Sequence, residues 1–125
     1  MFEIRVLPPS HLGPDGQRLG TITIGTFTET FPCYCGEGSI TEMESRWRDE
    51  LRKLLADKPA VALIHNPRFA WIFYREGNAC YVQQRLAING EFYPIAPRRT
   101  YEDGDRISEW ATNVVDIERF LNVAT

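Results

Sequence analysis

Three short hydrophobic segments between residues 60 and 85 constrain the fold of this chain more than any other feature. They cover residues 60–64, 69–74 and 80–85. Turn residues separate them, with Asn66-Pro67 after the first segment and Glu76-Gly77-Asn78 after the second. Because connections this short join antiparallel neighbours, the pattern predicts a β-meander. Segment 69–74 is apolar on both faces, which predicts a covered strand, and the fully apolar segment 60–64 predicts a central one.

The clearest helix pattern lies just before this meander. Its hydrophobic residues form one stripe at helical spacing: Met43, Trp47, Leu51, Leu54 and Leu55. Thr41 followed by Glu44 has the form of a capping box, and Pro59 ends the pattern near Lys58. These residues predict an amphipathic helix that packs its stripe on a sheet.

A second helix is predicted at the C-terminal end. Its stripe consists of Val114, Ile117, Phe120 and Leu121. Thr112 or Asn113 is the expected N-cap, and Asp116 is placed for a reciprocal bond. The two helix patterns therefore flank the strand-rich centre of the chain.

Further strand signals occur on both sides of the meander. The predicted strands are residues 2–7, 19–30 with a bulge at Gly25, 86–88 and 92–93 around the hairpin signal Asn89-Gly90, and 107–111. At 125 residues the chain is long enough for one hydrophobic core, so residues 1–125 are expected to form a single domain. The order of elements predicts an α+β fold, with antiparallel β-sheet or sheets and two α-helices packed against them.

The residues that could carry catalysis or bind a metal do not form a recognisable pattern. They are Cys33, Cys35, Cys80, His11 and His65. None has the spacing of a zinc site, and Gly36-Glu37-Gly38 lacks the residues of a phosphate-binding loop. We therefore expect no cofactor, no metal, no small-molecule substrate and no enzymatic activity. An acid–base enzyme that uses only carboxylates stays open, because sequence spacing cannot show whether two carboxylates meet.

The expected location is the cytoplasm, without a membrane partner. The first residues resemble a strand rather than a signal peptide, and no segment has the roughly 20 apolar residues of a membrane span. An odd number of cysteines argues against a disulfide framework.

The most unusual segment, residues 98–112, is acidic and aromatic. Its candidate binding residues are Tyr101, Glu102, Asp103, Asp105 and Glu109. A charged turn around Gly104, just before the last helix, would present carboxylates to a basic partner, although a solvated loop is an equally good interpretation. Trp110 fits a core role at least as well as a contact role. Glu37 and Glu42 are a weaker acidic candidate.

The alternative function is a module that binds single-stranded nucleic acid. Arg85, Arg98 and Arg99 lie near Tyr93 and Tyr101, and such modules combine basic and aromatic side chains. The adjacent carboxylates and the formal net charge of -3 weigh against it, so no nucleic acid is expected as a direct partner.

Several of these segments also resemble a known family. Trp71-Ile72-Phe73-Tyr74, Cys80-Tyr81-Val82-Gln83-Gln84, Asp103-Gly104-Asp105 and Ile107-Ser108-Glu109-Trp110-Ala111-Thr112 are similar to one group of immunity proteins from bacterial contact-dependent growth inhibition systems. The similar region runs from about Glu44 to Leu121, and the first forty residues resemble nothing recognisable.

The resemblance implies a specific function. Such a protein is a cytoplasmic inhibitor that binds the C-terminal toxin domain of a large surface-displayed effector as its partner and blocks it without a cofactor. The toxins are often nucleases, and the most similar relatives neutralise RNA-cleaving ones. The candidate residues from Tyr101 to Glu109 would then be toxin contacts, and the acidic turn would meet the basic surface on which a nuclease holds phosphates.

Overall fold

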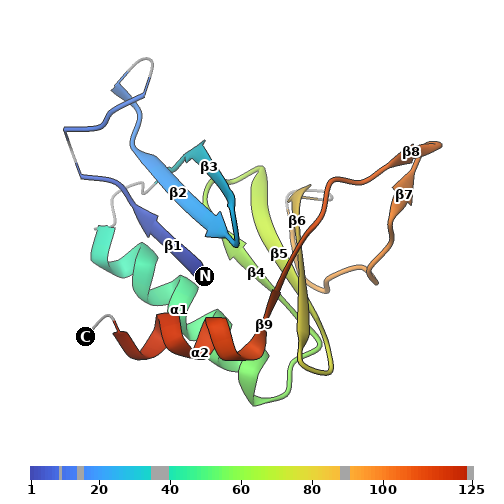
Figure 1. Cartoon of the computed structure of the whole chain (residues 1–125). Coiled ribbons are helices and arrows are strands. Elements are labelled where there is room, and N and C mark those ends of the chain that lie inside the picture. Colours follow the sequence, from blue (N-terminus) through green and yellow to red (C-terminus); the bar gives the residue numbers. More distant parts are fainter. Residues whose placement is uncertain (9, 14–15, 35–39, 88–90, 124–125) are drawn as a thin grey trace.

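The computed structural model describes residues 1–8, 10–13, 16–34, 40–87 and 91–123 (Figure 1). The elements are β1 (Phe2–Val6), β2 (Leu19–Ile24), β3 (Phe27–Pro32), α1 (Ile40–Ala56), β4 (Ala60–Ile64), β5 (Phe69–Glu76), β6 (Ala79–Leu86), β7 (Tyr101–Glu102), β8 (Asp105–Arg106), β9 (Trp110–Asn113) and α2 (Val114–Val123). Within these residues the strands form one sheet in the order β1-β2-β3, another in the order β4-β5-β6-β9, and the hairpin β7–β8. Every pairing is antiparallel, which confirms the predicted α+β class.

The N-terminal sheet corrects the prediction of one long strand over residues 19–30. The chain turns back between β2 and β3, where Ile24 pairs with Phe27. Gly25 has a φ of 63°, so it supplies the positive φ of a tight turn rather than a bulge in a continuous strand. Strand composition alone did not show where the segment folds back on itself.

The meander β4-β5-β6 is confirmed, but β4 lies at the edge of its sheet and not at the centre. Its side chains are apolar because both faces are covered: Val61 and Leu63 pack in the main core, and Ala62 packs in a small cluster on the opposite face. The indole N–H of Trp47 donates to Ile64 O at 2.9 Å, and the Tyr93 hydroxyl accepts from Ala62 N at 3.0 Å. These side-chain bonds satisfy part of the exposed backbone edge.

The helix α1 confirms the predicted stripe but not the capping box. It begins at Ile40, so Thr41 lies inside the helix. The Glu44 carboxylate accepts a hydrogen bond from Val6 N at 2.9 Å, and thus ties α1 to β1. At α2 the predicted Asn113 cap is confirmed, because Asn113 Oδ1 accepts from Asp116 N at 2.8 Å. The predicted reciprocal bond is not, because the Asp116 carboxylate accepts from Met1 N and Arg119 instead.

The C-terminal third departs most from the sequence prediction. The predicted Asn89-Gly90 turn lies outside the described residues, and Phe92 and Tyr93 do not lie in a strand. The last strand begins at Trp110 rather than at residue 107, and the hairpin β7–β8 precedes it.

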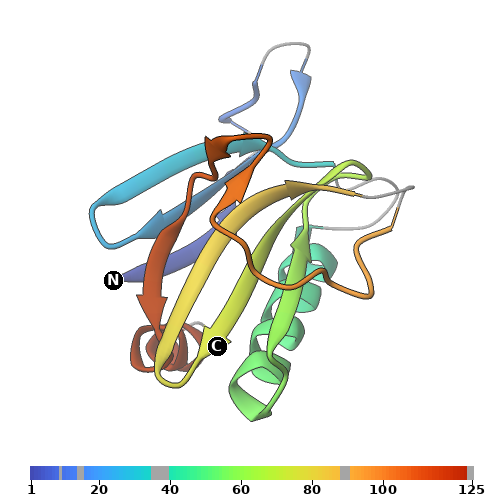
Figure 2. The ribbon, with the colours of Figure 1, turned by 90° about the vertical axis from the view of Figure 1, so that its right-hand side faces the viewer.

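The main core fills the space between the two sheets and the two helices. Its largest fully buried side chains include Trp71, Phe31, Phe73, Ile22 and Leu51. Figures 1 and 2 show α1 and α2 on one side of the molecule and the β7–β8 hairpin reaching away from it beyond β6. The hairpin therefore projects from the body of the fold.

Candidate interaction site

The hairpin β7–β8 is a two-residue turn at the end of a short ladder. Tyr101 pairs with Arg106 and Glu102 with Asp105, and Ile107 N donates to Thr100 O at 2.8 Å. Asp103 and Gly104 both have positive φ, at 53° and 84°. Two positive φ values in succession are the requirement of a type I′ turn, which Asp-Gly satisfies best. This dipeptide is the signal that could have predicted the hairpin from the sequence.

The carboxylate of Glu102 in β7 links the hairpin to the neighbouring sheet. Glu102 forms ion pairs with Arg85 of β6 at 3.2 Å and with Arg99 at 3.0 Å. The Arg85 side chain is only 19% exposed, so this contact is partly shielded from water. Glu102, one of the predicted site residues, therefore pairs with arginines of its own chain.

Glu109 is also engaged within the protein. Its carboxylate accepts two bonds from Arg98, at 2.8 and 2.6 Å, and one from Gln83 Nε2 at 2.7 Å. The Arg98 bond is the largest cause that lowers the pKa of Glu109, while burial acts in the opposite direction. The Arg98 guanidinium lies over the Tyr81 ring at 3.9 Å and also pairs with Glu76. Glu109 thus holds the base of the hairpin against β6.

Tyr101, Glu102, Asp103 and Asp105 are the exposed members of the predicted site, and of these Glu102 is the one paired with arginines of the same chain. Among the described residues neither aspartate forms an ion pair. Between the hairpin and the ends of β5 and β6 lies an open groove of 640 Å³. Phe69 and Leu86 are exposed in it, so an apolar surface lies beside the acidic tip.

The other acidic and aromatic candidates have separate positions. Trp110 is half-buried, stacks on Phe27 with ring centroids 4.1 Å apart and packs against the main core, although its edge lines the groove. Glu42 is exposed in the first turn of α1. Glu37 lies outside the described residues.

The cysteines and histidines that the structure describes do not assemble into a site. Cys33 and Cys80 are buried, and burial raises the pKa of the Cys80 thiol, while Cys35 lies outside the described residues. His11 is exposed beside Ser10. In the described part of the chain no group of three metal-binding side chains occurs, and no helix has the length and apolar character to cross a membrane.

His65 is a buried structural residue. Its Nδ1 lies 3.0 Å from Pro32 O and its Nε2 lies 3.1 Å from Gln84 Nε2. These partners assign the neutral tautomer in which Nδ1–H donates and Nε2 accepts. Burial lowers the pKa of His65 to about 4. The imidazole therefore links β3 to β6.

The three arginines of the predicted basic spot are all paired with carboxylates. Arg98 bonds to Glu109, and Arg85 and Arg99 share Glu102. Arg98 also pairs with Glu76, whereas Arg85 and Arg99 share one carboxylate and so leave a single positive charge over. One uncompensated charge is few for a protein that follows a phosphate backbone, which weighs against the nucleic-acid alternative.

Comparison with known proteins agrees with the resemblance seen in the sequence. The family model of the CdiI N-terminal domain matches residues 38–120. The fold is similar to a chain of the CdiA-CT/CdiI toxin and immunity complex from Enterobacter cloacae, with a TM-score of 0.76 and 24% sequence identity; the match covers 97% of this chain and 96% of that one. Among curated proteins, none matches this chain in sequence. Since the family model spans well over half of its residues, this chain belongs to the CdiI N-terminal domain family.

Proposed function

We propose that this protein is a cytoplasmic immunity protein that binds and neutralises the C-terminal toxin domain of a contact-dependent growth inhibition effector. Membership of the CdiI family is the observation that carries this proposal. The solved structure with the same fold comes from a complex of a toxin with its immunity protein. An inhibitor of this kind works by occupying a surface, so it requires neither a catalytic group nor a cofactor.

In this proposal the toxin contacts the tip of the β7–β8 hairpin and the groove beside it. Tyr101, Asp103 and Asp105 are exposed there, next to the apolar side chains of Phe69 and Leu86. An apolar centre with a charged rim is the usual anatomy of a protein interface. Glu102 and Glu109 support this surface from within, because their carboxylates already bind arginines of the same chain.

The toxin is proposed to be a nuclease, and specifically one that cleaves RNA. A nuclease carries basic residues where it holds phosphates. Two exposed aspartates that form no ion pair among the described residues complement such a surface and accelerate the encounter by electrostatic steering. The preference for RNA rests on the sequence resemblance to partners of RNA-cleaving toxins.

The first test is calorimetry with the toxin domain that this proposal assigns as the partner, the C-terminal domain of a contact-dependent growth inhibition effector from the same organism. The variant Asp103→Asn/Asp105→Asn removes both charges, and asparagine retains the tolerance for positive φ that position 103 needs. We expect about tenfold weaker binding, a slower association rate and a reduced dependence on salt. The matched control is Asp57→Asn/Glu118→Gln, which changes the net charge equally at two exposed positions outside the groove.

The possible results distinguish an error in the proposed function from an error in the proposed contact surface. If the wild-type chain does not bind the toxin domain and does not restore growth to cells that express it, the immunity function is wrong. If binding is tight but equal in the wild type and the hairpin variant, the function stands and the contact surface lies elsewhere. RNA degradation by the isolated toxin domain, blocked by equimolar immunity protein, tests the nuclease part of the proposal.

A further inference from the structure

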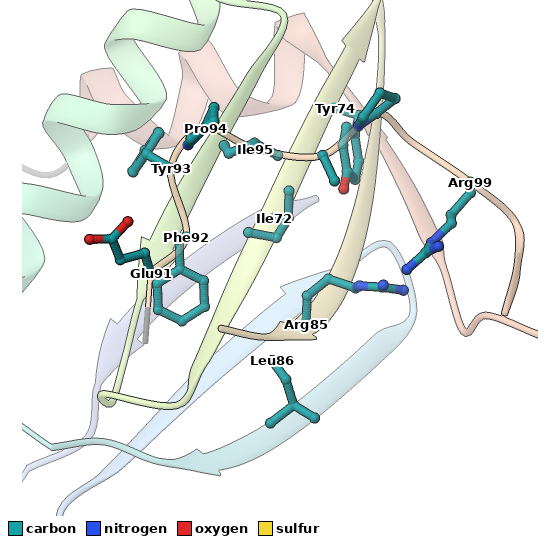
Figure 3. Close-up of a pocket in the computed structure, with 12 residues that line it drawn as sticks. Ile72, Tyr74, Arg85, Leu86, Glu91, Phe92, Tyr93, Pro94, Ile95 and Arg99 are labelled. Atoms are coloured by element: carbon teal, nitrogen blue, oxygen red, sulfur yellow. The ribbon is translucent and has the colours of Figure 1, made fainter. Parts of the chain in front are cut away.

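A separate pocket of 240 Å³ lies on the opposite face of the sheet from the main core (Figure 3). Its floor is formed by Ile72 and Tyr74 of β5 and Arg85 of β6. The segment from Phe92 to Ile95 crosses this face of the sheet beside Ile72 (Figure 3). The pocket is thus enclosed by a strap of chain on one side and by strands on the other.

The two ends of the pocket differ in chemistry. One end is mostly apolar and is lined by Ile72, Phe92, Pro94 and Ile95, with the exposed Glu91 beside Phe92 as the charged residue of this end (Figure 3). At the other end the Tyr74 hydroxyl and the guanidinium groups of Arg85 and Arg99 converge (Figure 3). Such a small convergent polar set at the end of an apolar cavity is the usual design of a site for a small ligand.

The Tyr74 hydroxyl is available as a donor. Burial raises the pKa of Tyr74, while the charges of Arg85 and Arg99 act in the opposite direction. None of the described residues makes a hydrogen bond with this hydroxyl. A ligand oxygen in the pocket would therefore give it a partner that the protein itself does not supply.

The polar end carries surplus positive charge. Arg85 and Arg99 share the single carboxylate of Glu102, at 3.2 and 3.0 Å, so two positive charges meet one negative charge. Glu102 approaches from the hairpin and is not among the residues that line the pocket. Its position demonstrates that both guanidinium groups can bind one carboxylate together.

We propose that this pocket binds a small organic carboxylate with an apolar stem. The carboxylate lies against Arg85 and Arg99 and accepts a hydrogen bond from the Tyr74 hydroxyl. The stem occupies the space between Ile72, Phe92 and Ile95. At 240 Å³ the pocket is smaller than the roughly 300–1,000 Å³ typical of drug-sized ligands, which limits the stem to about one ring.

This assignment makes Glu102 a competitor of the ligand. The ligand carboxylate and the Glu102 carboxylate are attracted to the same two arginines, and like charges repel each other at this distance. Removal of the Glu102 charge should therefore strengthen ligand binding. A pocket that binds only through apolar contacts would not respond in this way.

The probe is hydrocinnamate, which carries a phenyl ring, two methylenes and a carboxylate. Its binding to the isolated full chain is measured by methyl and backbone NMR shifts at Ile72 and Ile95. We expect saturable shifts for hydrocinnamate and about tenfold weaker binding of two comparators, its neutral amide and acetate. The amide lacks the charge and acetate lacks the stem.

Point variants locate the bound carboxylate. Arg99→Gln and Tyr74→Phe should each weaken hydrocinnamate binding, by about fivefold and about threefold, and Glu102→Gln should strengthen it by about fivefold. The controls Arg52→Gln and Glu118→Gln change exposed charges outside the pocket and should have no effect. Thermal unfolding verifies that each variant is folded, and Tyr74→Phe removes only one oxygen.

Two results would overturn the proposal. One is equal affinity for hydrocinnamate and its amide, and the other is absent or weaker hydrocinnamate binding in Glu102→Gln. The toxin is not needed for any of these measurements, so their failure leaves the proposed immunity function unaffected.

Discussion

At the scale of single residues, the same side-chain type has different roles according to its neighbours. Asp103 and Asp105 are exposed at the hairpin turn, whereas Glu109, a few residues later, is bound by Arg98 and Gln83. Charge alone therefore does not identify a binding residue in this segment. His65 is a second example, because its burial between β3 and β6 makes it a structural group and not a solvated one.

His65 should make the stability of the protein depend on pH. The unfolded chain protonates this imidazole below about pH 6.5, but the folded protein holds its pKa at about 4. Between these values the unfolded state binds more protons, so the stability is complete above pH 6.5 and falls as the pH decreases. The full contribution is about 3 kcal/mol.

Urea unfolding of the wild type and His65→Gln at several pH values tests this. The stability difference between the two should shrink as the pH falls from about 6.5 to about 4. His11→Gln, which removes an exposed histidine, should follow the wild type at every pH. A constant difference between wild type and His65→Gln would contradict a buried neutral imidazole.

At the scale of elements, the hairpin β7–β8 and the β5–β6 turn of the meander are both two-residue turns with a glycine of positive φ, but they are supported differently. Gly104 has a φ of 84° and Gly77 a φ of 66°, and a side chain at either position would meet nothing within 4 Å. The turn at Gly77 joins β5 and β6, two strands of the core sheet. The hairpin around Gly104 projects from the body and is held by Glu102.

The two glycine turns should therefore respond differently to alanine. Gly77→Ala should lower the melting temperature by about 4 °C, since a left-handed alanine costs about 1 kcal/mol within the cooperative core. Gly104→Ala should leave the melting temperature nearly unchanged and weaken toxin binding by about fivefold. Thermal unfolding and calorimetry measure both effects. If Gly104→Ala binds the toxin as tightly as Gly77→Ala and the wild type do, the toxin contact lies away from the hairpin.

At the scale of the whole molecule, two sheets share one core, and aromatic contacts connect them. Phe27 of β3 stacks on Trp110 of β9, and Phe31 of β3 contacts Trp71 of β5. Phe2 of β1 makes edge contacts with Phe73 of β5 and Phe120 of α2. These contacts fix the N-terminal sheet relative to β5, β9 and α2, and the hairpin β7–β8 directly precedes β9 in the chain.

The Phe27–Trp110 contact should be measurable as a coupling energy. A double-mutant cycle with Phe27→Ala and Trp110→Ala should give about 1 kcal/mol of interaction beyond the two single effects. Denaturant unfolding supplies the four stabilities. The cycle of Phe27→Ala with Val115→Ala, an exposed residue of α2, should be additive. If both cycles are additive, the stacked pair does not connect the sheets.

The local elements of this protein were determined by the sequence. The meander, the buried stripes of α1 and α2 and the Asn113 cap depend on residues close together in the chain, and periodicity exposes them. The hairpin at Asp103-Gly104 was also encoded locally, by a dipeptide suited to two positive φ values. Local patterns therefore predicted the fold class and most elements.

Only the tertiary structure decided the roles that depend on distant neighbours. In the folded chain the apolar β4 lies at the edge of its sheet, and the Glu109 carboxylate accepts a hydrogen bond from Gln83. Arg85 and Arg99 share the carboxylate of Glu102 beside a pocket. These outcomes could not be read from the sequence, because the burial and pairing of a charge depend on which strands become neighbours. That choice is made by the packing of the whole core.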